Sequence, residues 1–354
     1  MEKKLIFTND VAGAVDEAVA RMRPSGVFVL VDANTKSSVL PGLLAGSEAV
    51  AGAKVIEMGA GEEAKTLATL AGVWKELGDA GANRSSLLIN LGGGVVTDTG
   101  GFAAATFKRG MRFVNVPTTL LSAVDASVGG KTGINFNGLK NEVGVFAGAD
   151  LVVVSTVFFR TLGRGELLNG YAEMLKHALL TSGAMTERLL CRDVGSFGPD
   201  ELLALVRESV GVKERYVAAD PGDCGLRHAL NLGHTFAHAF EELGMWRRSP
   251  VSHGRAVAQG LVAALVLSHM EAGFPSGLLH KVATYVRDNY GAFGFDCEDY
   301  PRLLGYMERD KKNTARGAVS FTLLRAPGEP EVGVRVEECE ITAALDIHRD
   351  LLGI

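Results

Sequence analysis

The chain has 354 residues, of which 47% are hydrophobic and 22% are charged, so it has the composition of a globular protein. Its formal net charge of -5 argues against a general nucleic-acid binder, which needs a basic surface. The four cysteines are widely spaced, which fits neither a disulfide scaffold nor a thiolate zinc site. No apolar stretch is long enough to span a bilayer, and no signal-peptide core is present. We therefore expect a cytoplasmic protein with no nucleic-acid or membrane partner.

The first 157 residues alternate short apolar runs with helical patterns. The runs, which predict strands buried on both faces of a parallel sheet, are Val27–Val31, Val55–Met58, Leu87–Leu91, Phe113–Val116 and Leu151–Val154. Between the second and third runs, residues Glu62–Leu77 follow helical spacing. Strands separated by helices predict right-handed βαβ units. Residues 1–157 are therefore expected to form an α/β domain of the Rossmann type.

Residues 158–354 show longer helical periods and are expected to form a second, mainly α-helical domain. The predicted helices are Gly165–Leu180, Glu201–Ala219, Leu226–Leu243, His253–Glu271, Leu278–Asn289 and Glu338–Leu352. Two strand-like runs, Val319–Leu324 and Val332–Val336, are joined by a turn. No long linker separates the halves, so we expect them to pack against each other around a cleft.

A glycine-rich turn follows the third predicted strand. Gly92, Gly93 and Gly94 let a pyrophosphate approach the backbone closely, and the next helix offers unpaired N–H groups and its positive dipole end. The segment is neither a GxGxxG fingerprint nor a P-loop, so a plain strand-to-helix turn remains the alternative. Candidate ribose-binding residues, Asp32 and Asn34, follow the first strand, and Glu62 and Lys65 follow the second. Taken singly, these are turn and cap residues more often than ligands.

A group of polar residues lies within 33 positions and is interrupted by glycine pairs: Arg109, Asp125, Lys131, Lys140 and Asn141. Glycines beside a lysine predict a flexible turn that presents the ammonium group to an anion. Solvated loop charges are the alternative.

In the helical half, polar residues recur at i, i+3 and i+4 spacing. One helical face carries Glu173, Lys176 and His177, a second carries Arg227, Asn231, His234 and His238, and His253 opens a third helix. One carboxylate and two imidazoles from three helices could bind zinc and leave a position for substrate oxygens. The other histidines, His228, His269, His280 and His348, fit ordinary core or surface positions.

Together these motifs resemble one family, the 3-dehydroquinate synthases of the shikimate pathway. The matching runs, which lie between Gly92 and Asn313, are GGGVVTDTGGFAAATFKRG, VPTTLLSAVDASVGGKTGIN, KNEVGVF, GYAEMLKHALL, GLRHALNLGHTFAHAFE, HGRAVAQG and RDKKN.

The resemblance implies an N-terminal domain that binds NAD, a helical domain that binds Zn²⁺, with Co²⁺ as a substitute, and an active site between them. The zinc ligands carried over by motif are Glu173, His234 and His253. The implied NAD-binding residues are Asp32, Asn34, Glu62, Lys65, Gly93, Gly94, Val95, Asp98, Thr118, Thr119, Lys131, Lys140, Phe158, Thr161 and Leu162. The implied substrate-binding and catalytic residues are Arg109, Asp125, Lys131, Asn141, Lys176, Lys213, Arg227, Asn231, His238, Lys311 and Lys312. Asp223 stands where the family pattern usually has Glu.

The implied activity is that of a phosphate-eliminating carbon–oxygen lyase. It converts 3-deoxy-arabino-heptulosonate 7-phosphate, a small-molecule phosphorylated keto acid, to 3-dehydroquinate and phosphate, through transient oxidation by NAD, elimination, reduction and an internal aldol closure. The family also suggests a homodimer. Basic residues would hold both anionic ends of the substrate, which explains a local cationic site on an acidic chain.

Three alternatives remain open on the sequence. Sugar-phosphate cyclases that form inosose or valiolone rings share much of the pattern, but their substrates lack the carboxylate that Arg227 and Asn231 would bind. A metal-dependent alcohol dehydrogenase of similar architecture would release NADH. A binding module without catalysis is disfavoured, because every expected type of polar residue is retained.

Overall fold

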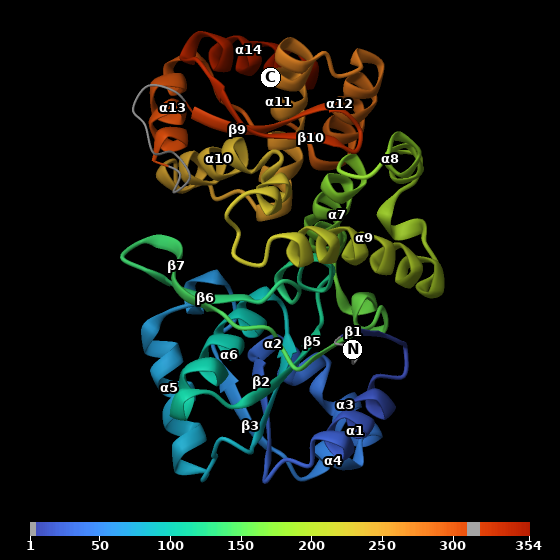
Figure 1. Cartoon of the computed structure of the whole chain (residues 1–354), viewed down its shortest axis with the longest axis vertical. Helices are drawn as coiled ribbons and strands as arrows, with labels where there is room; N and C mark the ends of the chain where they lie inside the picture. The colour runs from blue at the N-terminus through green and yellow to red at the C-terminus, as the bar shows by residue number, and fades with distance from the viewer. Residues whose placement is uncertain (1–4, 310–318) are drawn as a thin grey trace. The chain divides into compact units, whose positions relative to one another are not determined.

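The computed structural model describes residues 5–309 and 319–354, which form two compact units (Figure 1). The first unit comprises Met1–Gly170 and Phe197–Val210, and the second comprises Tyr171–Ser196 and Gly211–Ile354. The predicted domain boundary after residue 157 stays a prediction. Among the described residues, no helix combines the length and the apolar character needed to cross a membrane.

A six-stranded sheet forms the centre of the first unit. Its strands lie in the order β1-β8-β5-β4-β2-β3, and all neighbours pair in parallel. Their bounds are Leu5–Phe7 for β1, Val27–Asp32 for β2, Lys54–Met58 for β3, Leu87–Gly92 for β4, Arg112–Pro117 for β5 and Leu151–Val154 for β8. Every residue of the central strand β4 is buried, as its continuous apolar run predicts. The predicted α/β class is confirmed.

Helices cover both faces of this sheet (Figure 1). On one face, residues of α1, α3 and α4 share a core with β2, β4, β5 and β8, whereas α5 and α6 lie on the other face. The helices are α1 (Val11–Met22), α2 (Ala33–Ser38), α3 (Leu40–Gly46), α4 (Glu48–Ala51), α5 (Leu67–Asp79) and α6 (Gly94–Thr106). The predicted start of a helix at Glu62 is wrong, because Glu62–Ala64 form a short 3-10 turn and Thr66 caps α5 by accepting from Thr69 N.

A β-hairpin follows β5 and was not predicted. Strands β6 (Lys131–Phe136) and β7 (Leu139–Phe146) pair antiparallel around Asn137 and Gly138, whose φ angles are 50° and 78°. An Asn-Gly pair with positive φ at both residues is typical of a tight hairpin turn. The predicted turn beside Lys131 is present at Gly129 and Gly130, whose φ angles are 102° and 72°, and Lys131 follows it as the first residue of strand β6.

The second unit is mainly helical and carries one hairpin, as predicted. Its helices, with α7 and α9 shared between the two units, are α7 (Arg164–Leu179), α8 (Gly183–Leu190), α9 (Pro199–Ala219), α10 (His234–Trp246), α11 (His253–Ala272), α12 (Ser276–Tyr290), α13 (Tyr300–Glu308) and α14 (Glu338–Leu352). Helix α11 is buried along most of its length, where it packs against α10, α12, α14 and β9. The hairpin consists of β9 (Val319–Ala326) and β10 (Glu329–Val336).

The predicted helix Leu226–Leu243 is wrong, because the chain breaks at Gly233. Residues Leu226–Asn231 form a 3-10 segment, Gly233 has a φ of 78°, and α10 begins at His234. A Cβ at Gly233 would lie 2.8 Å from Leu261 N on α11, so only glycine fits this position. As a result, Arg227 and Asn231 do not share a helical face with His234 and His238.

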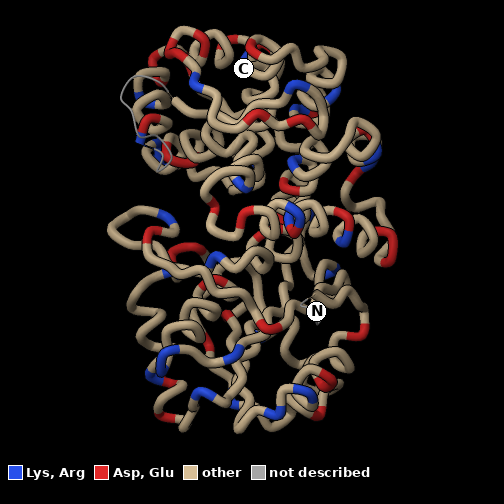
Figure 2. Tube along the Cα trace, in the orientation of Figure 1, with Lys and Arg blue, Asp and Glu red and all other residues tan. Residues whose placement is uncertain are grey.

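Short helical segments connect these elements. They are Phe107–Arg109 after α6, Ser122–Ala126 after β5, Val157–Thr161 after β8, Val194–Ser196 after α8 and Cys297–Asp299 before α13. Acidic and basic residues are interspersed along both units, in keeping with the small net charge (Figure 2).

Candidate functional site

The glycine-rich turn lies at the carboxyl end of β4, where the first unit has an open helix N-terminus. Gly93 is the N-cap of α6, and no side chain caps that helix. The turn adjoins the end of β5, since Thr118 N donates to Gly92 O at 3.0 Å and a Cβ on Gly93 would lie 3.1 Å from Thr119 Cγ2. Backbone N–H groups and the positive end of a helix dipole thus face the edge where open parallel sheets bind ligands.

Asp32, Asn34 and Phe158, which were also predicted to bind NAD, follow the carboxyl ends of parallel strands. Asp32 ends β2 and caps α2, because its Oδ1 accepts from Thr35 N at 2.8 Å, while Asn34 is exposed. Phe158, which comes after β8, packs against the core, and the Thr161 hydroxyl donates to its carbonyl at 2.7 Å. Asp32 is therefore a helix cap, as the alternative interpretation predicted. It also lies at the carboxyl edge of the sheet, where an NAD contact was predicted.

A buried lysine, itself one of the predicted residues, joins two others in the first unit. Lys65, whose residue exposure is 3%, donates from Nζ to Asp98 Oδ2 at 2.6 Å and to Asn141 Oδ1 at 2.5 Å. Asn135 on the hairpin donates to Glu62 Oε1 at 2.8 Å and accepts from Asn141 N at 2.9 Å. These contacts attach the β6–β7 hairpin to the segment after β3 and, through Lys65, to Asp98 on α6.

The predicted anion-binding residues of the first unit are more dispersed. Lys131 and Lys140 are exposed on the hairpin, and Asp125 lies in the π-helical turn Ser122–Ala126. Gly93 lies at the N-terminal end of α6, and Arg109 lies just beyond its C-terminal end. A helix of 13 residues is about 20 Å long, so the two residues are separated by roughly that distance. Arg109 has a φ of 67°, which is in the left-handed region. The first unit therefore does not bring Arg109 to the glycine-rich turn.

The second unit brings the three predicted metal ligands together. Ligand atoms of Glu173 on α7, His234 at the start of α10 and His253 at the start of α11 all lie within 4.8 Å of one another. Each histidine Nε2 lies 3.3 Å from Glu173 Oε1. The Lys176 ammonium, one turn along α7, forms an ion pair with Glu173 Oε2, and both residues are buried. One carboxylate and two imidazoles match the donors that zinc prefers.

The charges in this cluster stabilise one another. Burial by itself would raise the pKa of the Glu173 carboxyl, but the Lys176 charge and contacts with both histidines hold it well below its usual range. Burial and the nearby Lys176 charge lower the pKa of His234 to about 4, so its imidazole is neutral at pH 7. Burial opposes protonation of His253, but hydrogen bonds with Glu173 and Glu241 raise its pKa to about 10. Both Glu173 and His234 thus have the protonation state of a metal ligand.

Two further side chains of α10 adjoin the cluster. The His238 ring lies 5.6 Å from that of the candidate ligand His234, centroid to centroid. Glu241, which was not predicted, places Oε1 3.2 Å from His253 Nδ1 and is 5% exposed. The sequence does place Glu241 three residues after His238, on the same helical face. That spacing does not predict which residue the carboxylate contacts.

The remaining predicted substrate residues of the second unit are buried or lie outside the described residues. Lys213 and Arg227 are 7% and 3% exposed, and Asn231 is partly buried. The Asp220 carboxylate fixes the loop before Arg227, accepting from Cys224 N, Gly225 N and Arg227 N at 3.0, 2.7 and 3.2 Å. Asp223 has a φ of 55° in that loop and accepts from His228 Nε2 through its carbonyl. Lys311 and Lys312 lie outside the described residues.

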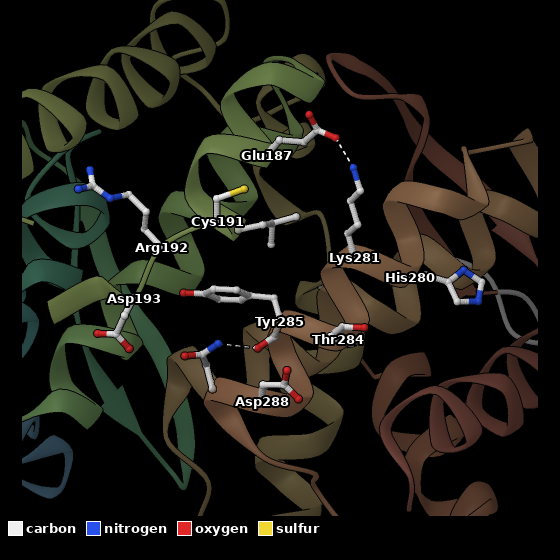
Figure 3. Close-up of a pocket in the computed structure, with 11 residues that line it drawn as sticks. Glu187, Cys191, Arg192, Asp193, His280, Lys281, Thr284, Tyr285 and Asp288 are labelled. Atoms are coloured by element: carbon white, nitrogen blue, oxygen red, sulfur yellow. Dashed lines mark hydrogen bonds and ion pairs between the residues drawn. The ribbon is translucent and has the colours of Figure 1, made fainter. Parts of the chain in front are cut away.

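A separate pocket of about 660 Å³ lies between the end of α8 and helix α12 (Figure 3). Its lining includes Cys191, Arg192 and Tyr285, with the Glu187–Lys281 ion pair beside them. None of its lining residues is among the predicted site residues, so the pocket does not coincide with the candidate metal site.

Comparison with known families decides what this arrangement belongs to. The family described as 3-dehydroquinate synthase N-terminal matches residues 55–169, and the family described as 3-dehydroquinate synthase C-terminal matches residues 170–313. The chain belongs to the 3-dehydroquinate synthase family. The matched regions contain the glycine-rich turn and all three candidate metal ligands.

Curated relatives extend this family match over the full chain. The 3-dehydroquinate synthase of Parabacteroides distasonis is 44% identical over 353 residues, which cover 100% of this chain and 99% of the relative. The 3-dehydroquinate synthase of Leptospira interrogans is 37% identical over 294 residues, covering 82% of this chain and 80% of the relative. The similarity thus reaches well beyond the motifs.

Solved structures of two other synthases share the fold. A 2-deoxy-scyllo-inosose synthase complexed with carbaglucose-6-phosphate, NAD⁺ and Co²⁺ matches with a TM-score of 0.85 at 20% identity, covering 98% of this chain and 96% of the other. The 2-epi-5-epi-valiolone synthase of Streptomyces hygroscopicus, with NAD⁺ and Zn²⁺ bound, matches with a TM-score of 0.83 at 24% identity, covering 99% and 97%. At these identities the likeness establishes the fold alone.

Proposed function

We infer that the chain is a 3-dehydroquinate synthase, a carbon–oxygen lyase that converts 3-deoxy-arabino-heptulosonate 7-phosphate to 3-dehydroquinate and phosphate. The observation that carries this inference is the buried Glu173–His234–His253 cluster, with Lys176 beside it, in a chain that both family halves match. A curated relative that is 44% identical over the full length carries the same name.

The residues of this cluster fit a divalent metal. One ionised carboxylate and one neutral imidazole converge with a second imidazole, and the donor atoms lie within 4.8 Å of each other. Zinc suits this donor set, and cobalt accepts the same geometry. When bound, the metal would act as a Lewis acid on a substrate hydroxyl or carbonyl oxygen. Glu173, His234 and His253 would hold it, and Lys176 would keep the Glu173 carboxylate ionised.

The glycine-rich edge of the first unit fits a dinucleotide. Gly93, Gly94 and Val95 present backbone N–H groups at the start of α6, with no capping side chain to compete for them. Asp32, Asn34 and the residues after β3, β5 and β8 would contact the rest of NAD, because they share that edge. NAD supplies a hydride acceptor that is regenerated when the hydride returns.

We assign the two anionic ends of the substrate to different residues. Arg227 can bind a carboxylate with two parallel N–H donors, and Asn231 follows it in the same 3-10 segment. Lys131 and a lysine of the Lys311–Lys312 pair would bind the phosphate as point charges, and the neutral amide of Asn141 would donate a hydrogen bond to it. His238, next to His234, would move the protons of the reacting hydroxyls. Arg109, Asp125, Lys213 and Lys140 would complete the polar surroundings.

A substrate comparison tests the activity. Purified protein with NAD and Zn²⁺ should release phosphate from the heptulosonate phosphate, without net formation of NADH. Glucose 6-phosphate and sedoheptulose 7-phosphate lack the carboxylate and should react far more slowly. Preference for either sugar phosphate would assign the chain to another cyclase activity, and accumulation of NADH would indicate a dehydrogenase.

We also propose that the chain forms a homodimer through the outer edge of β7. All eight residues of β7 are exposed, and Leu139, Val143, Val145 and Phe146 are apolar. No third strand pairs with β7 among residues 5–309 and 319–354, so its edge is open to a second copy. In an antiparallel pair centred on Asn141, Lys140 would face Glu142 of the other copy.

Sedimentation would test this assembly. Val143→Glu should convert a dimer to a monomer, whereas Met270→Glu, at an exposed apolar position of α11, should not. A monomeric wild-type chain at micromolar concentration would contradict the proposal. Cytoplasmic location likewise stays a proposal, which cell fractionation would test.

A further inference from the structure

Helix α10 carries a buried carboxylate that the proposed reaction does not use. His234, His238 and Glu241 follow one another at i, i+4 and i+7, which places them on one face of the helix. Glu241 is 5% exposed, whereas the side chain of its neighbour Glu242 is 40% exposed and its Oε2 lies 3.7 Å from Arg309 Nη2. A buried carboxylate is costly unless it is paired, so the partner of Glu241 indicates its role.

That partner is one of the candidate metal ligands. The His253 ring lies between two carboxylates, with Nδ1 3.2 Å from Glu241 Oε1 and Nε2 3.3 Å from Glu173 Oε1. The Nε2 atom faces the point where Glu173 and His234 converge. Since a neutral imidazole carries one proton, Nε2 can offer a lone pair to a cation only when Nδ1 carries that proton.

We propose that Glu241 is a positioning residue for the metal, and that it acts through His253. By accepting the Nδ1–H of His253, Glu241 holds the ring in the tautomer and orientation that turn the Nε2 lone pair toward Glu173 and His234. This is the carboxylate–histidine–metal arrangement that tunes many metal sites, and it rests on the metal site of the proposed function. It also explains why a carboxylate is buried on an otherwise apolar part of α10.

A purely structural ion pair between Glu241 and His253 would behave differently. Such a pair would affect the melting temperature of the metal-free protein, and the affinity for metal would stay unchanged in any variant that folds. A positioning residue instead changes the affinity and the geometry of the metal itself. The two roles therefore separate in a measurement of metal binding, independent of turnover.

The experiment measures Zn²⁺ affinity by competition with a chromophoric chelator, and Co²⁺ absorption spectra in the visible range, on full-length metal-free protein. Glu241→Ala should weaken Zn²⁺ binding by about 10- to 100-fold and alter the Co²⁺ bands. Glu241→Gln keeps a carbonyl acceptor of the same shape and should show a smaller loss. Glu242→Gln, the matched control on the exposed face, should bind Zn²⁺ like the wild type.

A double-mutant cycle shows whether Glu241 acts through His253. In a His253→Ala background, Glu241→Ala should cause no further loss of Zn²⁺ affinity, because the ring that it orients is gone. If Glu241→Ala does not fold, the intermediate affinity of Glu241→Gln carries the same test.

The possible failures are distinguishable. Wild-type Zn²⁺ affinity and Co²⁺ bands in a folded Glu241→Ala or Glu241→Gln variant would overturn the role of Glu241 and leave the metal site standing. Equal losses in the wild-type and His253→Ala backgrounds would overturn the route through His253. A wild-type protein that binds no Zn²⁺ at all would instead contradict the metal site of the proposed function.

Discussion

The candidate sites of the two units are built from different groups, mainly backbone in the first unit and side chains in the second. In the first unit, the candidate ligand contacts are backbone N–H groups and loop side chains at the edge of a parallel sheet, around a helix start that no side chain caps. In the second unit, they are side chains from three helices, with Glu173 and Lys176 fully buried and Glu241 almost so. One site depends on the shape of the backbone, and the other depends on charges that hold each other in place.

This difference predicts how each site responds to substitution. A backbone site tolerates most changes in side chains and fails when a Cβ fills the space of the ligand. A buried charge cluster fails when any member is removed, because the remaining charges lose their partners. The expected effects of mutation should therefore be larger in the second unit than in the first.

Removal of one metal ligand should have the largest effect. His234→Ala deletes one of the three donors and leaves Glu173 with one histidine fewer, so Zn²⁺ affinity and turnover should fall together by about 1,000-fold or more. Metal content after dialysis and phosphate release measure the two effects. His280→Ala is the control, since His280 lies on an exposed part of α12, where its Nδ1 is 2.8 Å from Ser276 O, one turn earlier on the same helix. Full zinc content in His234→Ala would remove His234 from the ligand set.

Substitution of the buried arginine should come next. Arg227→Lys keeps the charge but loses the two parallel donors, so kcat/KM for the heptulosonate phosphate should fall about 100-fold, with sugar phosphates that lack the carboxylate unaffected. Steady-state kinetics on both substrate types measure this selectivity. Arg192→Lys, at an exposed position after α8, should change neither. A uniform loss on all substrates would place Arg227 away from the carboxylate.

Closure of the backbone site should have a smaller effect. Gly93→Val puts a branched side chain at the N-cap of α6, where a Cβ already meets Thr119 Cγ2 at 3.1 Å, and should weaken NAD binding on the order of 30-fold. Calorimetric titration with NAD measures the affinity, and circular dichroism verifies the fold. Gly72→Val on α5 is the control, because its Cβ would meet nothing within 4 Å. Equal NAD affinity in both variants would mean that the glycine-rich segment is a strand-to-helix turn that does not bind NAD.

The same contrast explains which features were predictable from the sequence. The five longer strands of the sheet were found from continuous apolar runs, and α14 was found with its bounds. These patterns are local, since burial on both faces or on one stripe leaves a periodic trace. The metal cluster was predicted through family motifs, whereas helical spacing alone wrongly predicted a continuous stripe from Arg227 to His238.

The misses have long-range causes. The break at Gly233 is required by the backbone of α11, 28 residues further along at Leu261, so it leaves no periodic signal near Arg227. The hairpin around Asn137 and Gly138 is an exception, because its Asn-Gly pair with positive φ is a local signal for a tight turn. Glu241 was missed because its partner, His253, is on another helix.

The smallest expected effect tests whether the second unit stabilises buried charge in general or only where partners are present. His348 on α14 is fully buried, and its ring lies 5.7 Å from Phe240 and 5.6 Å from Phe295, centroid to centroid. Burial lowers the pKa of His348 to about 3, whereas that of His253 beside two carboxylates is raised to about 10. The two imidazoles are therefore opposite cases within one unit.

The sign of the pH effect follows from proton binding. Below the unfolded pKa of about 6.5, the unfolded chain protonates His348 and the folded chain does not, so folding stability falls as the pH falls. At pH 5.5 this linkage amounts to about 1.4 kcal/mol, and His348→Phe should remove it while keeping contact with Phe240 and Phe295. Urea denaturation of both proteins at pH 7.5 and 5.5 measures the change, with His280→Gln as the exposed control. If the stability difference between wild type and His348→Phe is the same at both pH values, then His348 titrates alike in both states, and burial without a partner does not exclude charge from this unit.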